Sequence, residues 1–186
     1  MGDQAANAQR YVAFLRAINV GGHTVKMDRL RALFAEQGFA NVSTFIASGN
    51  VLFDGPAGDA TALERQIERH LRQTLGYEVD TFLRTPAEVA AVAAHRPFGE
   101  GREAAGDTLY IAFLGSTPDE AAVQRLLALR NEVDDFHIHG REVYWGCRRT
   151  VSTSTFSPAK LEKILGMAAT LRNATTVRKL AGLVRS

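Results

Sequence analysis

Two glycine-containing segments in the first fifty residues carry side chains that could hold a ligand. The first is Asn19-Val20-Gly21-Gly22-His23, which combines two glycines with a histidine shortly before a predicted helix. Paired glycines let backbone N–H groups approach an anion, and a helix N-terminus favours negative charge. The alternative is a tight turn that needs glycine at positive φ. The chain contains no phosphate-loop pattern and no dinucleotide-binding fingerprint.

The second segment, Ser48-Gly49-Asn50, stands between two predicted strands. Glycine and asparagine tolerate the dihedral angles of a hairpin turn, so a plain turn explains the segment. In the functional alternative, Ser48 and Asn50 orient a bound polar group. Arg16 interrupts an apolar strand, where a charge is either paired with a neighbouring carboxylate or points into a site. The sequence leaves both alternatives open.

A hydroxyl-rich segment, residues 148–157, contains two arginines and six serines or threonines. It suits either a phosphate-binding loop or a solvated connection. Ser157 and Lys160 have the spacing of a serine–lysine nucleophile pair, but the companion motifs of that pair are absent. Because Ser157 precedes Pro158, we predict that it caps a helix instead.

His137 and His139 alternate along a predicted strand and therefore share one face. Together with Asp134 or Asp135 they could ligate a metal, but no third ligand stands at a recognised spacing. We therefore expect a solvent-facing strand surface, with no metal and no cofactor. Cys147 follows an apolar strand, and a buried thiol is the default for it.

The composition is that of a globular protein. Of 186 residues, 46% are hydrophobic and 23% are charged, which excludes a disordered chain. There is no run of about 20 apolar residues, so we expect no membrane association. The first residues lack the apolar segment of a signal peptide, and the single cysteine cannot form an internal disulfide. These features predict a cytoplasmic location.

Charge is distributed unevenly along the chain. From residue 141 onward there are nine basic and two acidic residues, a net charge of +7. The first 140 residues hold 13 basic and 18 acidic residues, a net charge of −5. This asymmetry favours an anionic partner, or attraction between the two ends of this chain or of neighbouring chains.

The hydrophobic pattern predicts the element order βαββαβ in the first half. The expected strands and helices there cover residues 11–18, 27–37, 42–47, 51–53, 61–75 and 79–83. Thr61 and Glu64 suggest a capping box for the second helix, and Thr85 and Glu88 suggest another for the helix that follows.

The same order returns in the second half. Residues 110–114 (YIAFL) repeat residues 11–15 (YVAFL), and the next expected helix starts at Thr117-Pro118. A hairpin is predicted over 136–147, then a helix from Pro158, a strand over 168–171 and a last helix over 175–184 that Asn173 or Thr175 caps. We therefore predict an α+β fold of two tandem ferredoxin-like (βαββαβ) halves from an internal duplication, plus a C-terminal helix. The predicted boundaries are 10–84, a connecting helix and glycine-rich linker over 85–106, and 107–186.

This topology has a geometric consequence. The loop after the first strand and the turn between the second and third strands lie at the same end of such a sheet. We therefore expect residues 19–23 to face residues 48–50. In the second half, residues 116–117 and 140–141 form the equivalent pair.

Three stretches of the chain, YVAFLRAINVGGH, FIASGNVLF and LEKILGMAATLRNATTVRKL, resemble the bacterial family called domain of unknown function 1697. The resemblance implies two ferredoxin-like halves and no established reaction. The chain departs from the family pattern at Ala17, where glycine is usual, at Thr155, where lysine is usual, and at Ala174, where an aromatic residue is usual. The positions that match the family pattern are Arg16, Asn19, Gly21, Gly22, Ser48, Gly49, Asn50, Ser154, Arg172 and Asn173.

These features favour a module that binds an anionic, phosphate-bearing ligand, either a nucleotide or a nucleic acid. The expected site combines loop 19–23, turn 48–50 and the basic C-terminal quarter. One alternative is an enzyme for a small molecule in which His23 acts as the acid or base. The other is an assembly or regulatory protein. The sequence does not fix the oligomeric state.

Overall fold

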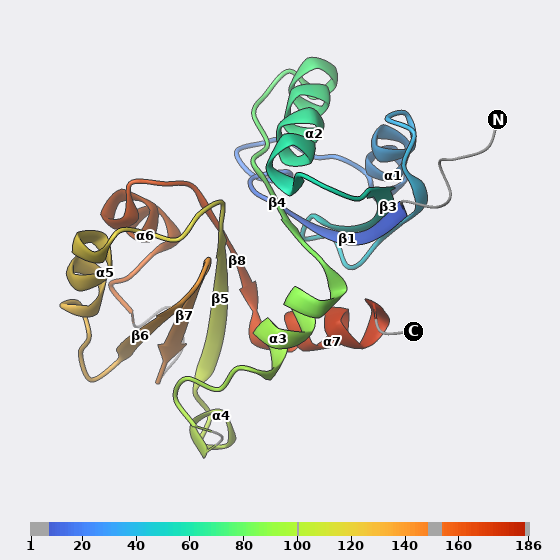
Figure 1. Ribbon diagram of the computed structural model, residues 1–186. Helices are drawn as coiled ribbons and strands as arrows, with labels where there is room; N and C mark the ends of the chain where they lie inside the picture. Colours follow the sequence, from blue (N-terminus) through green and yellow to red (C-terminus); the bar gives the residue numbers. More distant parts are fainter. Residues whose placement is uncertain (1–7, 100, 149–153, 185–186) are drawn as a thin grey trace. The chain divides into compact units, whose positions relative to one another are not determined.

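The computed structural model describes residues 8–99, 101–148 and 154–184. This part of the chain has an α+β architecture with two four-stranded antiparallel sheets and seven helices (Figure 1). The elements are β1 (Ala8–Leu15), α1 (Met27–Ala35), β2 (Ala40–Thr44), β3 (Asn50–Pro56), α2 (Ala60–Leu75), β4 (Thr81–Arg84), α3 (Pro86–Ala94), α4 (Gly101–Ala104), β5 (Thr108–Leu114), α5 (Glu120–Leu127), β6 (Asp134–His139), β7 (Glu142–Cys147), α6 (Pro158–Leu165), β8 (Ala169–Asn173) and α7 (Ala174–Val184).

The described residues form two compact units. The first unit comprises 8–89 and 180–184, and the second comprises 90–179. The strand order is β2-β3-β1-β4 in the first sheet and β6-β7-β5-β8 in the second. In each sheet the first strand along the chain lies between two antiparallel neighbours.

The core of the first unit lies between one face of its sheet and helices α1 and α2. Alternate residues of β1 point to opposite faces, which directs Tyr11, Ala13 and Leu15 into this core. Helical spacing directs Leu63, Ile67 and Leu71 of α2 into the same core. No helix in the described part of the chain is long and apolar enough to cross a membrane.

The second unit repeats this packing with α5 and α6. Phe136, Trp145 and Cys147 are buried on the face of the sheet that these helices cover. Tyr11 and Tyr110 both pack against the cores rather than forming an exposed stacking platform. The sheets therefore lack, at these positions, the exposed aromatic side chains with which such sheets bind RNA.

Two predicted helix starts are wrong. The N-cap of α2 is Asp59, whose carboxylate accepts from the N–H groups of Thr61 and Ala62. Glu64 takes no part in a capping box, because it is buried and accepts the N–H of Leu83 at 2.7 Å. In the same way, Asp119 caps α5. The sequence analysis had placed that start at Thr117.

Two other predicted caps are confirmed. Thr85 and Glu88 exchange both hydrogen bonds of a capping box at the start of α3. Ser157 Oγ accepts the N–H of Lys160 and caps α6. This bond accounts for the Ser157–Lys160 spacing and leaves no role for Ser157 as a nucleophile. Within the segment expected to be a glycine-rich connector, residues 101–104 form the short helix α4.

Candidate functional site

The predicted neighbours at one end of the first sheet do lie together. We call residues 16–26 and 45–50 the loop–turn end. The N–H of Leu15 donates to the carbonyl of Gly49 at 2.8 Å, and Asn19 Nδ2 donates to the carbonyl of Ala47 at 3.3 Å. In the second unit, Leu114 N–H donates to the carbonyl of Arg141 in the same way, at 3.0 Å. The expected proximity of loop and turn is confirmed.

Asn19 holds the loop–turn end in shape. Its Oδ1 accepts the N–H of Val25 at 2.7 Å while its Nδ2 reaches Ala47. Gly21 and Gly22 are exposed and have positive φ angles, so glycine suits both positions. The His23 ring is also exposed and stacks on Tyr77, with ring centroids 3.8 Å apart.

Gly49 and Asn50 of the turn are buried and contact neighbouring residues of the protein. Asn50 is completely buried, and its Nδ2 donates to the carbonyl of Phe45 and to Ser48 Oγ. A Cβ atom on Gly49 would lie 2.7 Å from Ile18 Cγ2, which is too close, and φ at Gly49 is +75°. These contacts favour the plain-turn interpretation of Ser48-Gly49-Asn50.

Arg16 follows β1 directly and is paired. Its Nη1 donates to Asp80 Oδ2 at 3.1 Å, and its backbone N–H donates to the carbonyl of Asp80. Both side chains are more than a third exposed. Of the two alternatives for Arg16, the structure therefore shows the salt bridge to a neighbouring element. This salt bridge places Arg16 beside a surface cleft that Asp80 lines.

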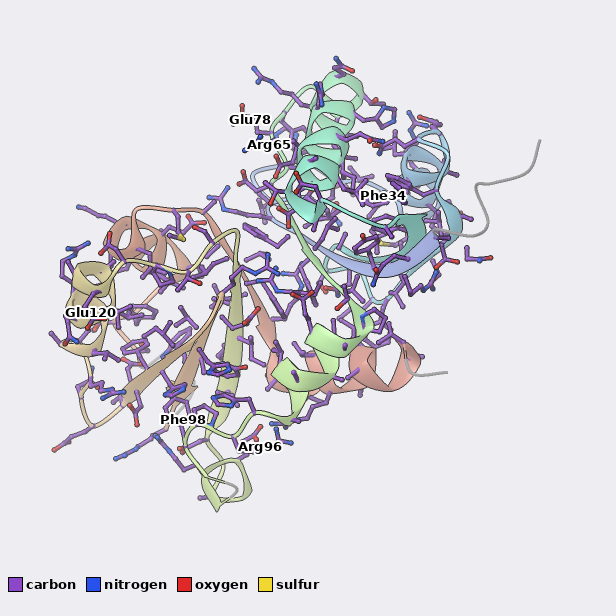
Figure 2. The ribbon with its side chains drawn as sticks, in the orientation of Figure 1. Phe34, Arg65, Glu78, Arg96, Phe98 and Glu120 are labelled. Atoms are coloured by element: carbon purple, nitrogen blue, oxygen red, sulfur yellow. The ribbon has the colours of Figure 1, made fainter. Side chains whose placement is uncertain are left out.

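That cleft, which we call the α2 cleft, has a volume of about 310 Å³. Its walls are one face of α2 and the segment that leads into β4, namely Arg65, Glu68, Arg69, Arg72, Glu78, Val79 and Asp80. Figure 2 labels Arg65 and Glu78 on this side of the first unit. A second hollow beside Phe98 has a volume of only about 10 Å³, room for no more than about one water molecule.

Charges in the α2 cleft are only partly compensated. Arg72 pairs with Glu78 at 3.2 Å, and Glu68 Oε1 accepts the N–H of Thr81 at 2.9 Å. Burial raises the pKa of Glu68, and the Thr81 hydrogen bond opposes that change. Arg65 and Arg69 are exposed and form no ion pair within the described residues. These two guanidinium groups can receive an anion.

The arginines of this cleft are not among the site residues predicted from the sequence, although the sequence carries a signal for them. Arg65, Arg69 and Arg72 follow the i, i+4, i+7 spacing that places residues on one helix face. The apolar face of the same helix was the one used to predict it.

The predicted site residues of the second half do not gather at one place. Ser154 Oγ bonds both oxygens of Asp134 in β6 at 2.8 Å. Arg172 lies in β8, and β6 and β8 are the opposite edges of the second sheet. Asn173 Oδ1 accepts the N–H of Thr175 and caps α7. The greater part of the hydroxyl-rich segment, residues 149–153, lies outside the described residues.

Arg172 is buried and forms hydrogen bonds with neighbouring residues of its own strand. Its Nη1 donates to Thr170 Oγ1 and to the carbonyl of Leu171, each at 2.8 Å. Burial lowers the pKa of Arg172 to about 10, so the group stays charged at neutral pH. Arg178 forms a double hydrogen bond with Glu103. At least these two charges of the basic C-terminal quarter are therefore already engaged.

The His–Asp metal set, the alternative that the sequence did not favour, does not form among the described residues. Asp134 accepts from Trp145 Nε1 and Ser154, and Asp135 pairs with Arg102 and Arg130. His137 and His139 do lie on the same strand, β6. A further histidine, which the sequence analysis did not connect with them, lies beside both.

A family model described as "Protein of unknown function (DUF1697)" matches residues 8–144. The chain belongs to the DUF1697 family. A search of curated proteins finds no match to it. Among solved structures, the conserved bacterial protein SP0830 from Streptococcus pneumoniae is similar over 96% of this chain and 99% of that one, with a TM-score of 0.74 and 20% sequence identity. At that identity the likeness shows the fold alone.

One departure of this DUF1697 protein from the family pattern has a structural consequence. Ala17 has a φ angle of +62°, in the left-handed region that glycine adopts without strain. The glycine usual in DUF1697 chains suits this backbone better than the alanine found here. Of the other two departures, Ala174 is buried at the start of α7 and Thr155 is exposed.

Proposed function

We propose that this protein binds a small phosphate-bearing ligand, and that the α2 cleft receives it. The observation that carries the proposal is the pair Arg65 and Arg69, which lie one helical turn apart at the cleft without an ion-pair partner in the described part of the chain. Each guanidinium group can donate two parallel hydrogen bonds to phosphate oxygens. The cleft volume of about 310 Å³ falls at the lower end of the range for small-molecule sites.

The neighbouring charges support a phosphate ester over a bare anion. Glu68, Glu78 and Asp80 line the same cleft, and each accepts a hydrogen bond or forms an ion pair within the chain. A ligand with both a phosphate and hydroxyl or amino groups would satisfy the arginines and the carboxylates together. Arg16, bound to Asp80, keeps one of these carboxylates oriented.

Two further proposals concern the history and location of the chain. We propose that the two sheets derive from one duplicated ferredoxin-like unit, residues 10–84 and 107–186, with residues 85–106 joining them. The shared strand order and the equivalent pairs Val12–Arg84 and Ile111–Arg172 support this origin. A cytoplasmic location is supported by the single, buried cysteine.

The test compares two double variants, each of which removes two positive charges from a different surface. Isothermal titration with ADP and with ribose 5-phosphate, at low and moderate salt, gives affinities for the unmodified chain. The R65Q/R69Q variant removes two charges from the α2 cleft. The control, K160Q/K163Q, removes two exposed charges from α6 in the basic C-terminal quarter.

We expect R65Q/R69Q to weaken binding at least tenfold and K160Q/K163Q to leave it unchanged. If K160Q/K163Q weakens binding and R65Q/R69Q leaves it unchanged, the ligand binds at the C-terminal quarter instead. Equal affinity in all three proteins, or no binding at all, would refute the cleft proposal. A short oligonucleotide whose affinity falls steeply with salt, with no response to the small phosphates, would identify a nucleic-acid partner instead.

A further inference from the structure

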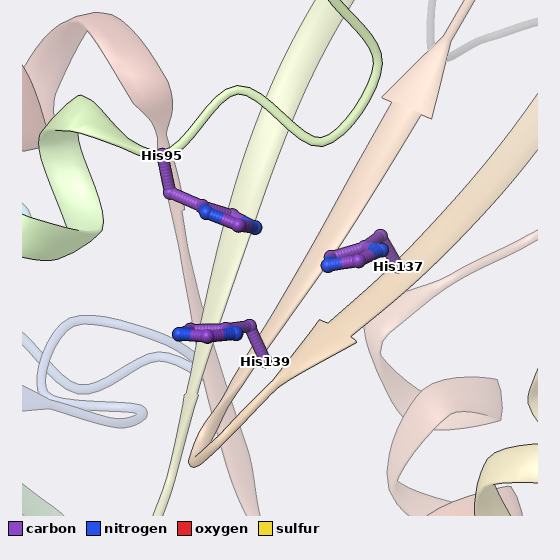
Figure 3. Close-up of side chains that lie close together, drawn as sticks. All are labelled: His95, His137 and His139. Atoms are coloured by element: carbon purple, nitrogen blue, oxygen red, sulfur yellow. The ribbon is translucent and has the colours of Figure 1, made fainter.

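Three histidine side chains meet on one face of the second sheet, within the second unit (Figure 3). His137 and His139 are two residues apart in β6, so they share a face. The residue between them, Ile138, packs with Phe136 in the core on the opposite face. The two imidazoles therefore lie on the side of the sheet away from α5 and α6.

The third side chain, His95, comes from the end of α3. Its backbone N–H donates to the carbonyl of Ala91 at 3.1 Å, which extends the last helical turn. Tyr144 Oη lies 3.4 Å from the carbonyl of Val92 and ties α3 to β7. The His95 ring centroid is then 4.6 Å from that of His139 and 5.2 Å from that of His137.

The nitrogen atoms of the three rings lie close to the separation that a metal ion requires. One ligand nitrogen from each ring lies within 4.8 Å of the others. Two nitrogens bound to tetrahedral Zn²⁺ are about 3.3 Å apart, given Zn–N distances of about 2.0–2.1 Å. The rings of His95 and His139 are stacked, with an interplanar angle of 21°, so metal binding requires the exposed His139 and the half-buried His137 to turn about their side-chain bonds and direct their in-plane lone pairs at one ion.

One nitrogen of His95 lacks a partner in the described part of the chain. His95 Nε2 is buried and has no hydrogen-bond partner among the described residues. Buried polar atoms nearly always have a partner, because an unpaired one destabilises the folded protein. A metal ion would give this atom a partner.

Burial affects two of the three imidazoles. Burial lowers the pKa of His95, and His139 adds to this effect. Burial also lowers the pKa of His137, with further contributions from His95, His139 and Arg130, while Asp135 acts in the opposite direction. Both changes favour the neutral imidazole, which is the form that binds a metal.

We infer that His95, His137 and His139 form a binding site for one divalent transition-metal ion, in the zinc class, with a remaining position open to solvent. Imidazole ligands favour Zn²⁺, Cu²⁺, Ni²⁺ and Co²⁺ over Mg²⁺ or Ca²⁺. Asp134 and Asp135 are engaged elsewhere, and Cys147 packs in the core on the opposite face. His139 is exposed, so water can complete the coordination. The site is separate from the α2 cleft of the first unit.

The test uses the full chain without a histidine tag, after treatment with a chelator. Zinc titration by calorimetry gives stoichiometry and affinity. Co²⁺ provides a second readout, because its visible absorption is strong in four-coordinate sites and weak in octahedral ones. The variants are H139A and H137Q, and the control is H23A, which removes an exposed histidine from the first unit.

We expect one Zn²⁺ per chain, intense Co²⁺ absorption, and a loss of at least a hundredfold in affinity in H139A and in H137Q, with H23A unchanged. Since His139 is exposed, H139A is expected to fold, and its thermal unfolding without metal checks this. No saturable binding of one equivalent would refute the site. So would equal binding by H139A and the unmodified chain, or a loss confined to H23A.

Discussion

Ser154 donates its hydroxyl hydrogen bond to the buried carboxylate of Asp134, 2.8 Å away, and the same carboxylate accepts Trp145 Nε1 at 2.8 Å. Ser154 Oγ also accepts the N–H of Phe156. This network ties the segment before α6 to β6 and β7. Ser154 matches the family pattern, and its contacts give it a role in stability.

The network makes S154A a test of that role. The substitution leaves a buried carboxylate with one partner fewer, so we expect the free energy of unfolding to fall by about 2 kcal/mol. Trp145 is the only tryptophan of the chain, so its fluorescence follows unfolding of the second unit. The exposed neighbour Thr155 supplies the control, T155A. If both variants unfold alike, the hydrogen bond to Asp134 contributes little.

Ala17 offers a gain in stability. Its φ of +62° strains an L-residue by about 1–2 kcal/mol. Glycine removes that strain but costs about 0.4–1 kcal/mol through the entropy of the unfolded chain. We expect A17G to raise the free energy of unfolding by about 0.5–1 kcal/mol in urea denaturation. The matched control is A13G in buried β1, which should lower it. A decrease in A17G similar to that in A13G would contradict this account.

Asn50 should matter for stability more than for ligand affinity. N50A removes a fully buried amide and leaves the part-buried carbonyl of Phe45 without this partner, at a cost of about 2 kcal/mol. Chemical denaturation measures the loss, and S48A, at an exposed position, is the milder comparison. If N50A keeps its stability and loses affinity for phosphate ligands, Asn50 belongs to the binding site and the turn is not merely structural.

The βαββαβ element order could be predicted because each element carries a local signal. The repeat of YVAFL as YIAFL predicted β5, and the Thr85–Glu88 capping box predicted the start of α3. The start of α2 could not be fixed in the same way. Glu64 satisfies the spacing of a capping box, but tertiary structure turns its carboxylate to the N–H of Leu83 in β4. β1 includes residues before its apolar run, and one of them, Arg10, pairs with Asp54 across the sheet.

The sites were less predictable than the fold. Strand topology was enough to bring residues 19–23 and 48–50 together, since it depends only on element order. His95 could not be joined to His137 and His139 in this way, because a helix packed on a sheet sets the contact and no spacing in the chain encodes it. The net charge of the C-terminal quarter also overstated its free basic surface. Arg172 is buried, and Arg178 is paired with Glu103.

The ion pair between Arg178 and Glu103 predicts a specific response to acid. Hydrogen bonds from Arg178, with bonds of 2.8 and 2.6 Å, lower the pKa of Glu103 below its ordinary value of 4.5. A carboxyl whose pKa is lower in the folded protein stabilises it above the unfolded pKa, and this contribution disappears as the pH falls through the folded pKa. Both side chains are about 30% exposed, so the contribution at neutral pH is about 1 kcal/mol or less.

Urea denaturation of the unmodified chain and of E103Q, followed by Trp145 fluorescence across the acid range, measures this contribution. We expect E103Q to be less stable at neutral pH and the difference to shrink as the pH falls below about 4.5, because the unmodified carboxyl then becomes neutral as well. E132Q, which changes an exposed carboxylate without an ion pair in the described residues, should differ less from the unmodified chain at neutral pH. A difference between E103Q and the unmodified chain that stays constant down to the lowest pH would mean that packing around α4, and not the charge of Glu103, sets its contribution.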